Sequence, residues 1–216
     1  WLPILIGSAG ISLAATDPLA ASLRPEERGF PSIRSFIPRD YQGHNQIWTA
    51  VEGNNEVMFF GANDEIITFD GITWRKIPIP GGSFIRAMDV DAAGTIWVGG
   101  VNELGYIAPA PGGEITFHSL LSFLPPEIKQ VGDVRRAIVM PDGVYFQTDA
   151  YLFRWHQEAF QLWPMHEPYV TLATRWQDRI IVSRDQSWAM PTADGGWEDL
   201  PGMPDPDLHL LLSHIV

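Results

Sequence analysis

Hydrophobic and polar residues alternate along much of the chain in short runs, and turns rich in Gly, Asp, Asn and Pro separate these runs. Such runs are typical of β-strands. The clearest one lies in Asp91–Gly100, where a polar turn leads into Ile96, Trp97 and Val98 and ends at a glycine pair. β-Branched and aromatic residues favour strands, whereas Asp and Gly favour tight turns. We therefore expect a turn followed by a short strand.

This unit recurs along the chain. Related strands begin at Val57, Ile96, Val144 and Ile180, which are 39, 48 and 36 residues apart. An apolar-rich strand is expected before each one, over residues 47–51, 85–90, 134–139 and 169–174. An aromatic residue that closes a further strand follows each one after 16 to 21 residues: Trp74, Phe117, Phe160 and Trp197. A period of roughly 40 residues with several short strands per copy is typical of a β-propeller with one blade per repeat.

The predicted fold class is all-β: a β-propeller of which about four blades of an expected seven-bladed ring are present. The blades are expected over about residues 41–80, 81–121, 134–164 and 169–203, with a fifth beginning at residue 207. Propellers close with 4 to 8 blades, because an open ring leaves two exposed edges. We therefore expect an N-terminal fragment of a longer protein; the alternative is a four-bladed ring closed by the terminal strand. The connection over residues 122–133 is expected to carry one helical turn.

The first residues resemble an export signal. Residues 1–15 are apolar and uncharged, and the small residues Ala20, Ala21 and Ser22 follow. This pattern is typical of the core and cleavage region of a signal peptide, and it is shorter than the roughly 20 apolar residues that span a membrane. We interpret residues 1–24 as a signal-peptide-like segment without its basic start and residues 25–40 as a lead-in. The alternative is a buried first strand or helix.

Composition excludes several kinds of chemistry. The net charge of −12 disfavours binding to nucleic acid or anionic lipid. The chain has no cysteine, so neither disulfides nor thiolate chemistry are expected. It contains no Gly-x-Ser-x-Gly motif, no Gly-rich phosphate loop and no paired metal-ligand motif. We therefore predict no catalytic residue, no metal and no cofactor, and we expect that this segment is not an enzyme.

Two motifs carry a resemblance to a known family. Asp91-x-x-Gly94-x-Ile96-Trp97-Val98-Gly99 resembles the repeat of the two-component regulator propeller family. The run from His44 to Trp48, with Phe60-Gly61 and the stretch Phe69-Asp70-Gly71-Ile72-Thr73-Trp74, resembles the opening of that family's ligand-binding sensor domains. The resemblance covers about residues 41–203. It is strongest in the first two blades, because Tyr145 and Ile181 stand in blades three and four where the repeat has Trp.

The resemblance implies a location and partners. It places the propeller on the periplasmic or extracellular side of a membrane-anchored bacterial protein. It also implies a downstream triple-tyrosine domain, a transmembrane helix and a cytoplasmic signalling domain in the same polypeptide, such as a histidine kinase, a cyclase or a DNA-binding regulator. A homodimer is a further possibility.

Candidate ligand-binding residues follow from propeller topology. The loop after the second strand of each blade and the connection into the next inner strand surround the mouth of the central channel. Each such loop carries a carboxylate, often beside an amide, and arginines begin nearby inner strands. Such a concave, polar site suits a small polar ligand such as a glycan or a peptide. The candidates are His44, Asn45, Asn63, Asp64, Arg86, Asn102, Glu103, Arg135, Asp149, Arg184 and Asp185.

Other interpretations stay open. Asn and Asp often cap their own turns, and an arginine at a strand start often pairs with such a carboxylate; Asp91 and Asp142 are expected to be turn formers. The first functional hypothesis is a sensory propeller that binds a ligand or a partner and relays to an output domain. The alternatives are a sialidase- or lyase-like propeller enzyme acting on glycans and a secreted interaction scaffold. The Asp91–Trp97 unit resembles a sialidase Asp-box, but the spacing differs, and only Arg86, Arg135 and Arg136 resemble the required arginine cluster.

Overall fold

The computed structural model describes residues 33–81, 83–109, 114–165, 173–184 and 187–203. The chain divides into two compact units, Trp1–Phe36 and Ile37–Val216. In the described part of the first unit, residues 33–36 have no regular secondary structure, and the guanidinium carbon of Arg34 lies 4.7 Å from the centroid of the Phe36 ring. The signal-peptide-like segment over residues 1–24 lies outside the described residues.

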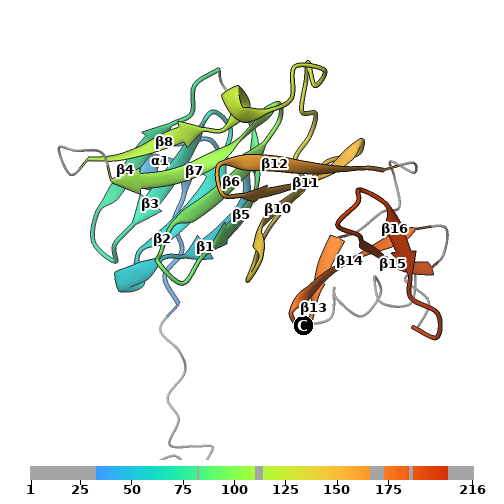
Figure 1. Ribbon diagram of the computed structural model, residues 1–216. Coiled ribbons are helices and arrows are strands. Elements are labelled where there is room, and N and C mark those ends of the chain that lie inside the picture. The colour runs from blue at the N-terminus through green and yellow to red at the C-terminus, as the bar shows by residue number, and fades with distance from the viewer. Residues whose placement is uncertain (1–32, 82, 110–113, 166–172, 185–186, 204–216) are drawn as a thin grey trace, which may run out of the picture. The chain divides into compact units, whose positions relative to one another are not determined.

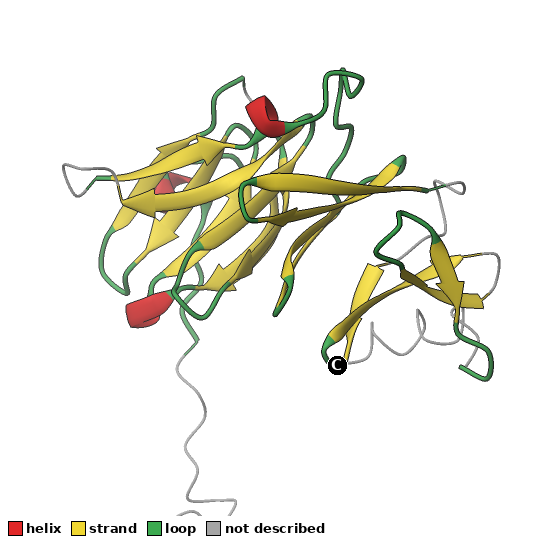
Figure 2. Ribbon diagram, in the orientation of Figure 1, coloured by secondary structure: helices red, strands yellow, loops and turns green. Residues whose placement is uncertain are grey.

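The described residues of the second unit form four antiparallel sheets with four strands each (Figures 1 and 2). We call them blades one to four. Blade one contains β1 (Ile47–Glu52), β2 (Met58–Ala62), β3 (Glu65–Phe69) and β4 (Trp74–Pro78). Blade two contains β5 (Ile85–Val90), β6 (Ile96–Gly100), β7 (Glu103–Pro109) and β8 (Ile115–Ser119). Blade three contains β9 (Arg136–Met140), β10 (Gly143–Gln147), β11 (Tyr151–His156) and β12 (Ala159–Pro164). Blade four contains β13 (Ala173–Trp176), β14 (Arg179–Arg184), β15 (Ser187–Pro191) and β16 (Trp197–Asp199).

In every blade the strands pair in the order of the sequence. A row of four-stranded meanders is the architecture of a β-propeller, so the predicted all-β propeller class is confirmed. The expected fifth blade from residue 207 lies outside the described residues, and the size of the ring stays a prediction.

Some elements differ from their expected bounds. The strand expected over residues 134–139 begins at Arg136. The Val134 N–H bonds to the Gly100 carbonyl of blade two, whereas the Arg135 N–H already bonds to the Gln147 carbonyl of the partner strand β10. Of the strand expected over residues 169–174, only Ala173 and Thr174 lie within the described residues, and β13 continues to Trp176. In the described part of the chain, three short helices lie outside the sheets: α1 (Pro38–Tyr41) and the 3₁₀ turns η2 (Asn54–Glu56) and η3 (Leu121–Phe123). The turn η3 opens the long connection in which a helical turn was expected.

Apolar side chains hold consecutive blades together. Between blades one and two, buried residues such as Ile66 and Ile77 pack in one cluster with Ile85 and Val98. Further clusters join blade two to blade three and blade three to blade four. Close approach requires glycine at one of these interfaces: a Cβ atom at Gly99 would lie 3.0 Å from the Cβ atom of Val134 and closer still to its Cγ1 atom.

The turn that opens β6 is organised by Asp91. One carboxylate oxygen accepts hydrogen bonds from the backbone N–H groups of Ala93 and Thr95, both at 2.9 Å, and the other accepts one from the Trp97 indole at 3.0 Å. Gly94 adopts a φ of 85°, which favours glycine. Asp91 therefore forms a turn, as expected.

The Asp89 carboxylate connects three inner strands through hydrogen bonds. Asp89 on β5 accepts hydrogen bonds from the Val139 N–H on β9 at 2.8 Å and from Arg175 on β13 at 3.2 Å. Arg175 donates a further bond to the Val139 carbonyl at 2.8 Å. Blades two, three and four are thus linked through polar groups as well as through apolar packing.

Candidate functional site

The mouth is the face at which the inner strands β1, β5, β9 and β13 begin. Here the loop after a second strand lies beside the connection into the next inner strand. An isolated antiparallel bridge joins Asn63 to Phe84, and another joins Val101 to Asp133. The topology that suggested the candidate residues is therefore present between blades one and two and between blades two and three.

A series of polar and aromatic contacts crosses the mouth from blade one to blade three. We call it the mouth network, and it contains both predicted candidates and residues that were not predicted. Its members are His44, Trp48, Asn63, Arg86, Asp133, Arg135 and Asp149.

Asn63 fixes the blade-one end of the network. Its side-chain oxygen accepts a hydrogen bond from the Trp48 indole at 2.8 Å, and its amide nitrogen lies 3.2 Å from Nδ1 of His44. The backbone N–H of Gln46 also donates to His44 Nδ1 at 3.2 Å. Trp48 is therefore held in one orientation while 37% of it stays exposed to solvent.

Arg86 connects blade one to the connection that precedes blade three. Its guanidinium carbon lies 4.3 Å from the centroid of the Trp48 ring, which is cation–π geometry. Its Nε atom lies 3.0 Å from a carboxylate oxygen of Asp133. The cation is thus placed between an aromatic face and a carboxylate.

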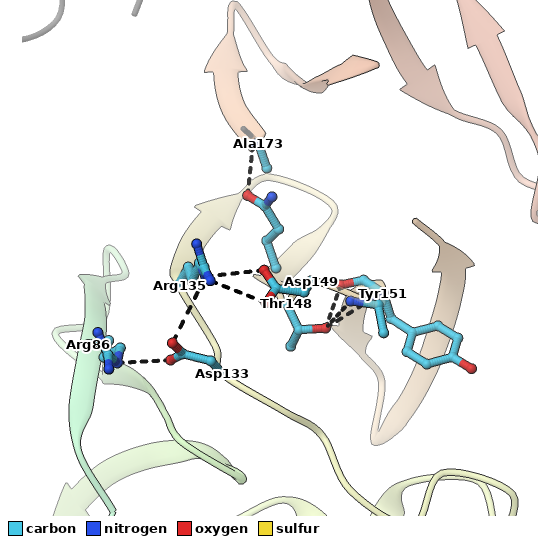
Figure 3. A network of polar contacts seen from close by, with 9 residues as sticks. Arg86, Asp133, Arg135, Thr148, Asp149, Tyr151 and Ala173 are labelled. Carbon is cyan, nitrogen blue, oxygen red and sulfur yellow. Dashed lines mark hydrogen bonds and ion pairs between the residues drawn. The ribbon is translucent and has the colours of Figure 1, made fainter. Parts of the chain in front are cut away.

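Arg135 continues the alternation of charges (Figure 3). Its Nε atom lies 3.9 Å from Asp133 and 3.2 Å from Asp149, and its Nη2 donates to the second oxygen of Asp149 at 3.2 Å. The Arg135 side chain remains 48% exposed. Figure 3 shows Arg86, Asp133, Arg135 and Asp149 as a row in which cation and anion alternate.

The Thr148 hydroxyl group fixes the loop that carries Asp149. Thr148 is buried, and its Oγ1 atom accepts hydrogen bonds from the backbone N–H groups of Ala150 and Tyr151 at 3.3 and 3.0 Å. Beside it, the buried side-chain oxygen of Gln147 accepts a bond from the Ala173 N–H at 2.7 Å. The end of β10 therefore also sets the start of β13, on the inner strand of blade four.

Two predicted candidates serve the loops rather than the network. Asn102 has a φ of 56°, and its side chain accepts the Gly132 N–H at 3.0 Å. Asp64 has a φ of 66°, and its backbone bonds to Ser83 and Ile79. These residues shape the rim on which the network lies.

Glu103 is buried instead of facing the mouth. Its Oε1 atom accepts hydrogen bonds from the Ser119 hydroxyl at 2.7 Å and from the Leu104 N–H at 3.0 Å. Burial raises the pKa of Glu103 above its ordinary value, because desolvation penalises the carboxylate more than these two hydrogen bonds stabilise it. Glu103 joins β7 to the edge strand β8.

The remaining candidates do not join the network. Arg184 places its guanidinium carbon 4.9 Å from the Trp197 ring centroid, in its own blade. Asn45 is exposed and makes no side-chain hydrogen bond to a described residue. Asp185 lies outside the described residues.

Two network residues, Trp48 and Asp133, were missed by sequence reasoning. Trp48 lies in the run that marked the start of blade one, and it was read only as a strand residue. Asp133 lies two residues before Arg135, and that spacing is the one signal in the sequence for a carboxylate at the head of an inner strand.

The described residues show which chemistry the mouth can support. Within them, no group of three or more His, Cys, Asp or Glu side chains could hold a metal ion. They also include no helix that is long and apolar enough to cross a membrane. Both network carboxylates are held by arginines, so the arrangement offers fixed hydrogen-bonding groups beside an exposed aromatic ring. This is the chemistry of a binding site.

No protein family matches the sequence, and no curated protein matches it either. Several solved structures are similar in fold, among them the following two. A catalytically inactive virginiamycin B lyase from Staphylococcus aureus with quinupristin aligns at 14% identity and a TM-score of 0.56, over 74% of this chain and 57% of that one. An extracellular domain from B. thetaiotaomicron, assigned to the hybrid two-component system BT4673, aligns at 16% identity and a TM-score of 0.54, over 74% of this chain and 23% of that one.

This chain therefore spans less than two thirds of the length of either structure. At such low identity the likeness concerns the fold alone. Together with the four meander blades, it identifies the fold of this chain as a β-propeller.

Proposed function

We propose that the chain is a sensory β-propeller segment of a bacterial signal-transduction protein. It binds a small polar ligand, a glycan or a peptide, at the mouth and relays this event to an output domain of the same polypeptide. The observation that carries the proposal is the mouth network, which joins three blades and leaves a partly exposed aromatic ring beside the Arg86 guanidinium. The fold similarity to an extracellular domain of a signalling system is in keeping with it.

The network favours recognition over turnover. Catalysis by a general acid and base requires groups that exchange protons with the substrate. Here Asp133 is engaged by Arg86, and Asp149 is engaged by Arg135. Trp48, by contrast, has its indole N–H satisfied by Asn63 and presents its apolar ring to solvent. An oriented aromatic ring beside fixed polar groups binds a polar ligand at low entropic cost.

A ligand at this position would contact more than one blade. Trp48 belongs to blade one, Arg86 to blade two and Arg135 to the head of blade three. A ligand that touches them stabilises one relative placement of the blades and shifts the population toward it. Such a shift is the signal that an output domain would receive.

Ligand binding can be tested by thermal unfolding with a panel of mono- and disaccharides and dipeptides. A ligand that binds the folded state stabilises it by RT ln(1 + L/Kd), where L is the free ligand concentration, so the midpoint of unfolding rises as this concentration is raised. We expect at least one member to do so, and Trp48→Ala to abolish the shift. Phe123→Ala is the matched control, because Phe123 is also an exposed aromatic residue but lies in η3, outside the mouth network. Loss of the shift in both variants would contradict a site at the mouth.

Location and reaction class need separate tests. Alkaline phosphatase fused after Met203 is active only outside the cytoplasm, so activity of the fusion in cells expressing the gene from its natural start is expected. An inactive fusion with normal expression would contradict the proposed location. Mass spectrometry of a binding ligand after long incubation should return it unchanged. A converted product would instead favour the propeller-enzyme alternative.

A further inference from the structure

A groove lies between blades three and four on the face opposite the mouth. It has a volume of about 340 Å³, toward the lower end of the range of ~300–1,000 Å³ that is usual for small-ligand sites. Asp142 and Tyr145 line it from blade three, and Asp178, Arg179, Met190 and Glu198 line it from blade four. None of these residues belongs to the mouth network, so the groove is a separate feature of the protein.

The floor of the groove is apolar and aromatic. Tyr145 and Met190 are 4% and 8% exposed. The Tyr145 hydroxyl donates to Asp142 at 2.7 Å, and Arg154 donates to the same carboxylate oxygen at 2.9 Å. The charge of Asp142 is therefore balanced by Arg154, and the Tyr145 ring is fixed in place.

Hydrogen bonds join blade three to blade four beside the groove. Trp163 on β12 donates its indole N–H to the Thr192 carbonyl at 2.8 Å, and Gln161 donates to the Ala193 carbonyl at 2.9 Å. Thr192 and Ala193 also line the groove, in the turn between β15 and β16. The groove is thus bounded by residues that hydrogen bonds hold across the blade interface.

The rim carries an excess of negative charge. Asp178 and Glu198 are exposed and form no ion pair with any described residue. Arg179 supplies one positive charge, and its Nη1 atom rests 3.5 Å from the Met190 sulfur instead of pairing with either carboxylate. With Asp142 balanced by Arg154, the groove keeps two carboxylates against one guanidinium.

From this combination we propose that the groove binds a small organic cation, namely a primary amine on a short apolar or aromatic body. The carboxylates attract the ammonium group, and the Tyr145 ring and the Met190 thioether accommodate the apolar part. A simple anion would meet net repulsion, and a neutral molecule would gain only the apolar contact. This inference does not rest on the proposed function, because no residue of the mouth network takes part.

A matched set of ligands tests the proposal: phenethylamine, 2-phenylethanol and phenylacetate share one ring and a short linker and differ in charge. We expect titration calorimetry on the whole chain at low salt to show binding of phenethylamine. Binding of 2-phenylethanol should be at least about tenfold weaker, and phenylacetate should not bind, because only the amine is attracted by the rim. Added salt should weaken amine binding by screening.

Substitutions locate the site. Asp178→Asn and Glu198→Gln should each weaken phenethylamine binding about three- to tenfold, because each removes one exposed charge near the ligand. Asp199→Asn is the matched control: Asp199 adjoins Glu198 on β16, and successive strand residues point to opposite faces. Its binding constant should stay within about twofold of that of the wild type.

Circular dichroism and the unfolding midpoint would confirm that the three variants fold. The proposal is overturned if 2-phenylethanol binds as tightly as the amine, or if phenethylamine shows no saturable binding. Unchanged affinity in both Asp178→Asn and Glu198→Gln, or an equal loss in Asp199→Asn, also overturns it.

Discussion

Arg86 on blade two lies with its guanidinium carbon 4.3 Å from the centroid of the Trp48 ring on blade one. The same guanidinium reaches Asp133, in the connection to blade three. One side chain of blade two therefore links blade one to the connection into blade three. It couples the orientation of the exposed ring to the row of charges that crosses the mouth.

Replacing this arginine should weaken the fold measurably. Arg86→Gln removes a cation–π contact worth about 0.5–1 kcal/mol and a partly buried ion pair worth about 1 kcal/mol, whose side chains are 31% and 24% exposed. We expect the free energy of unfolding in urea to fall by about 1 kcal/mol. Arg75→Gln is the control, because Arg75 pairs with Asp70 within one blade and its side chain is 64% exposed. An equal loss in the control would mean that the contact between blades contributes nothing.

The hydrogen bond from the Ala173 N–H to the Gln147 side chain should contribute strongly to the stability of β13, because its donor is buried. Gln147→Leu keeps the side chain's bulk but leaves the buried Ala173 N–H without its acceptor, at a cost of about 1–3 kcal/mol. Hydrogen exchange should show faster opening of β13 than of β5. Gln161→Leu, which removes a bond to the Ala193 carbonyl at a half-buried site, should leave β13 protected. Unchanged exchange of β13 in Gln147→Leu would contradict this role.

Glu103 should make stability depend on pH. Its folded-state pKa lies above the ordinary value of 4.5, because burial disfavours the carboxylate. The folded state therefore binds this proton more tightly than the unfolded state, and stability falls as pH rises from about the unfolded pKa through the folded pKa. Glu103→Gln removes this dependence while its side-chain oxygen can still accept from Ser119 and Leu104.

The variant should accordingly gain stability relative to the wild type between acidic and neutral pH. Urea unfolding of both proteins at several pH values across this range measures the difference. A difference that stays constant with pH would contradict a raised pKa for Glu103.

The glycine pair that ends β6 should resist enlargement. A methyl group at Gly99 would collide with Val134, so Gly99→Ala should cost about 1–3 kcal/mol by overpacking. Gly196→Ala is a suitable control, since the nearest atom to its added carbon is the Thr192 hydroxyl oxygen at 3.1 Å. Combining Gly99→Ala with Val134→Ala should recover part of the loss. Strictly additive losses would show that the collision is not the cause.

The fold could be predicted because its information is local and repeated. The run Ile96-Trp97-Val98-Gly99-Gly100 predicts a strand that ends at the glycine pair, and the strand found there has the expected bounds. Bounds were less accurate where tertiary contacts intervene: Val134 is apolar like a strand residue, but it packs under Gly99 before the strand begins.

The candidate site could be predicted in part for a similar reason. Propeller topology brings Asn63, Arg86, Arg135 and Asp149 to one face, and this follows from their places between strands. Whether a carboxylate at such a place faces the mouth depends on the next strand, and Glu103 turns toward Ser119 instead. The groove lined by Tyr145 and Glu198 could not be predicted from a local sequence pattern, because its residues are brought together only by the packing of two blades.

The tie between Asp89 and Arg175 joins the inner strands of blades two and four, which are not neighbours in the sequence of repeats. In an array where each unit touches only the next, a disturbance weakens step by step. Here loss of the Arg175 charge on β13 would directly remove the ion pair with Asp89 on β5, two repeats earlier. The blades therefore interact beyond their nearest neighbours, and blades two to four are expected to unfold as a single cooperative unit.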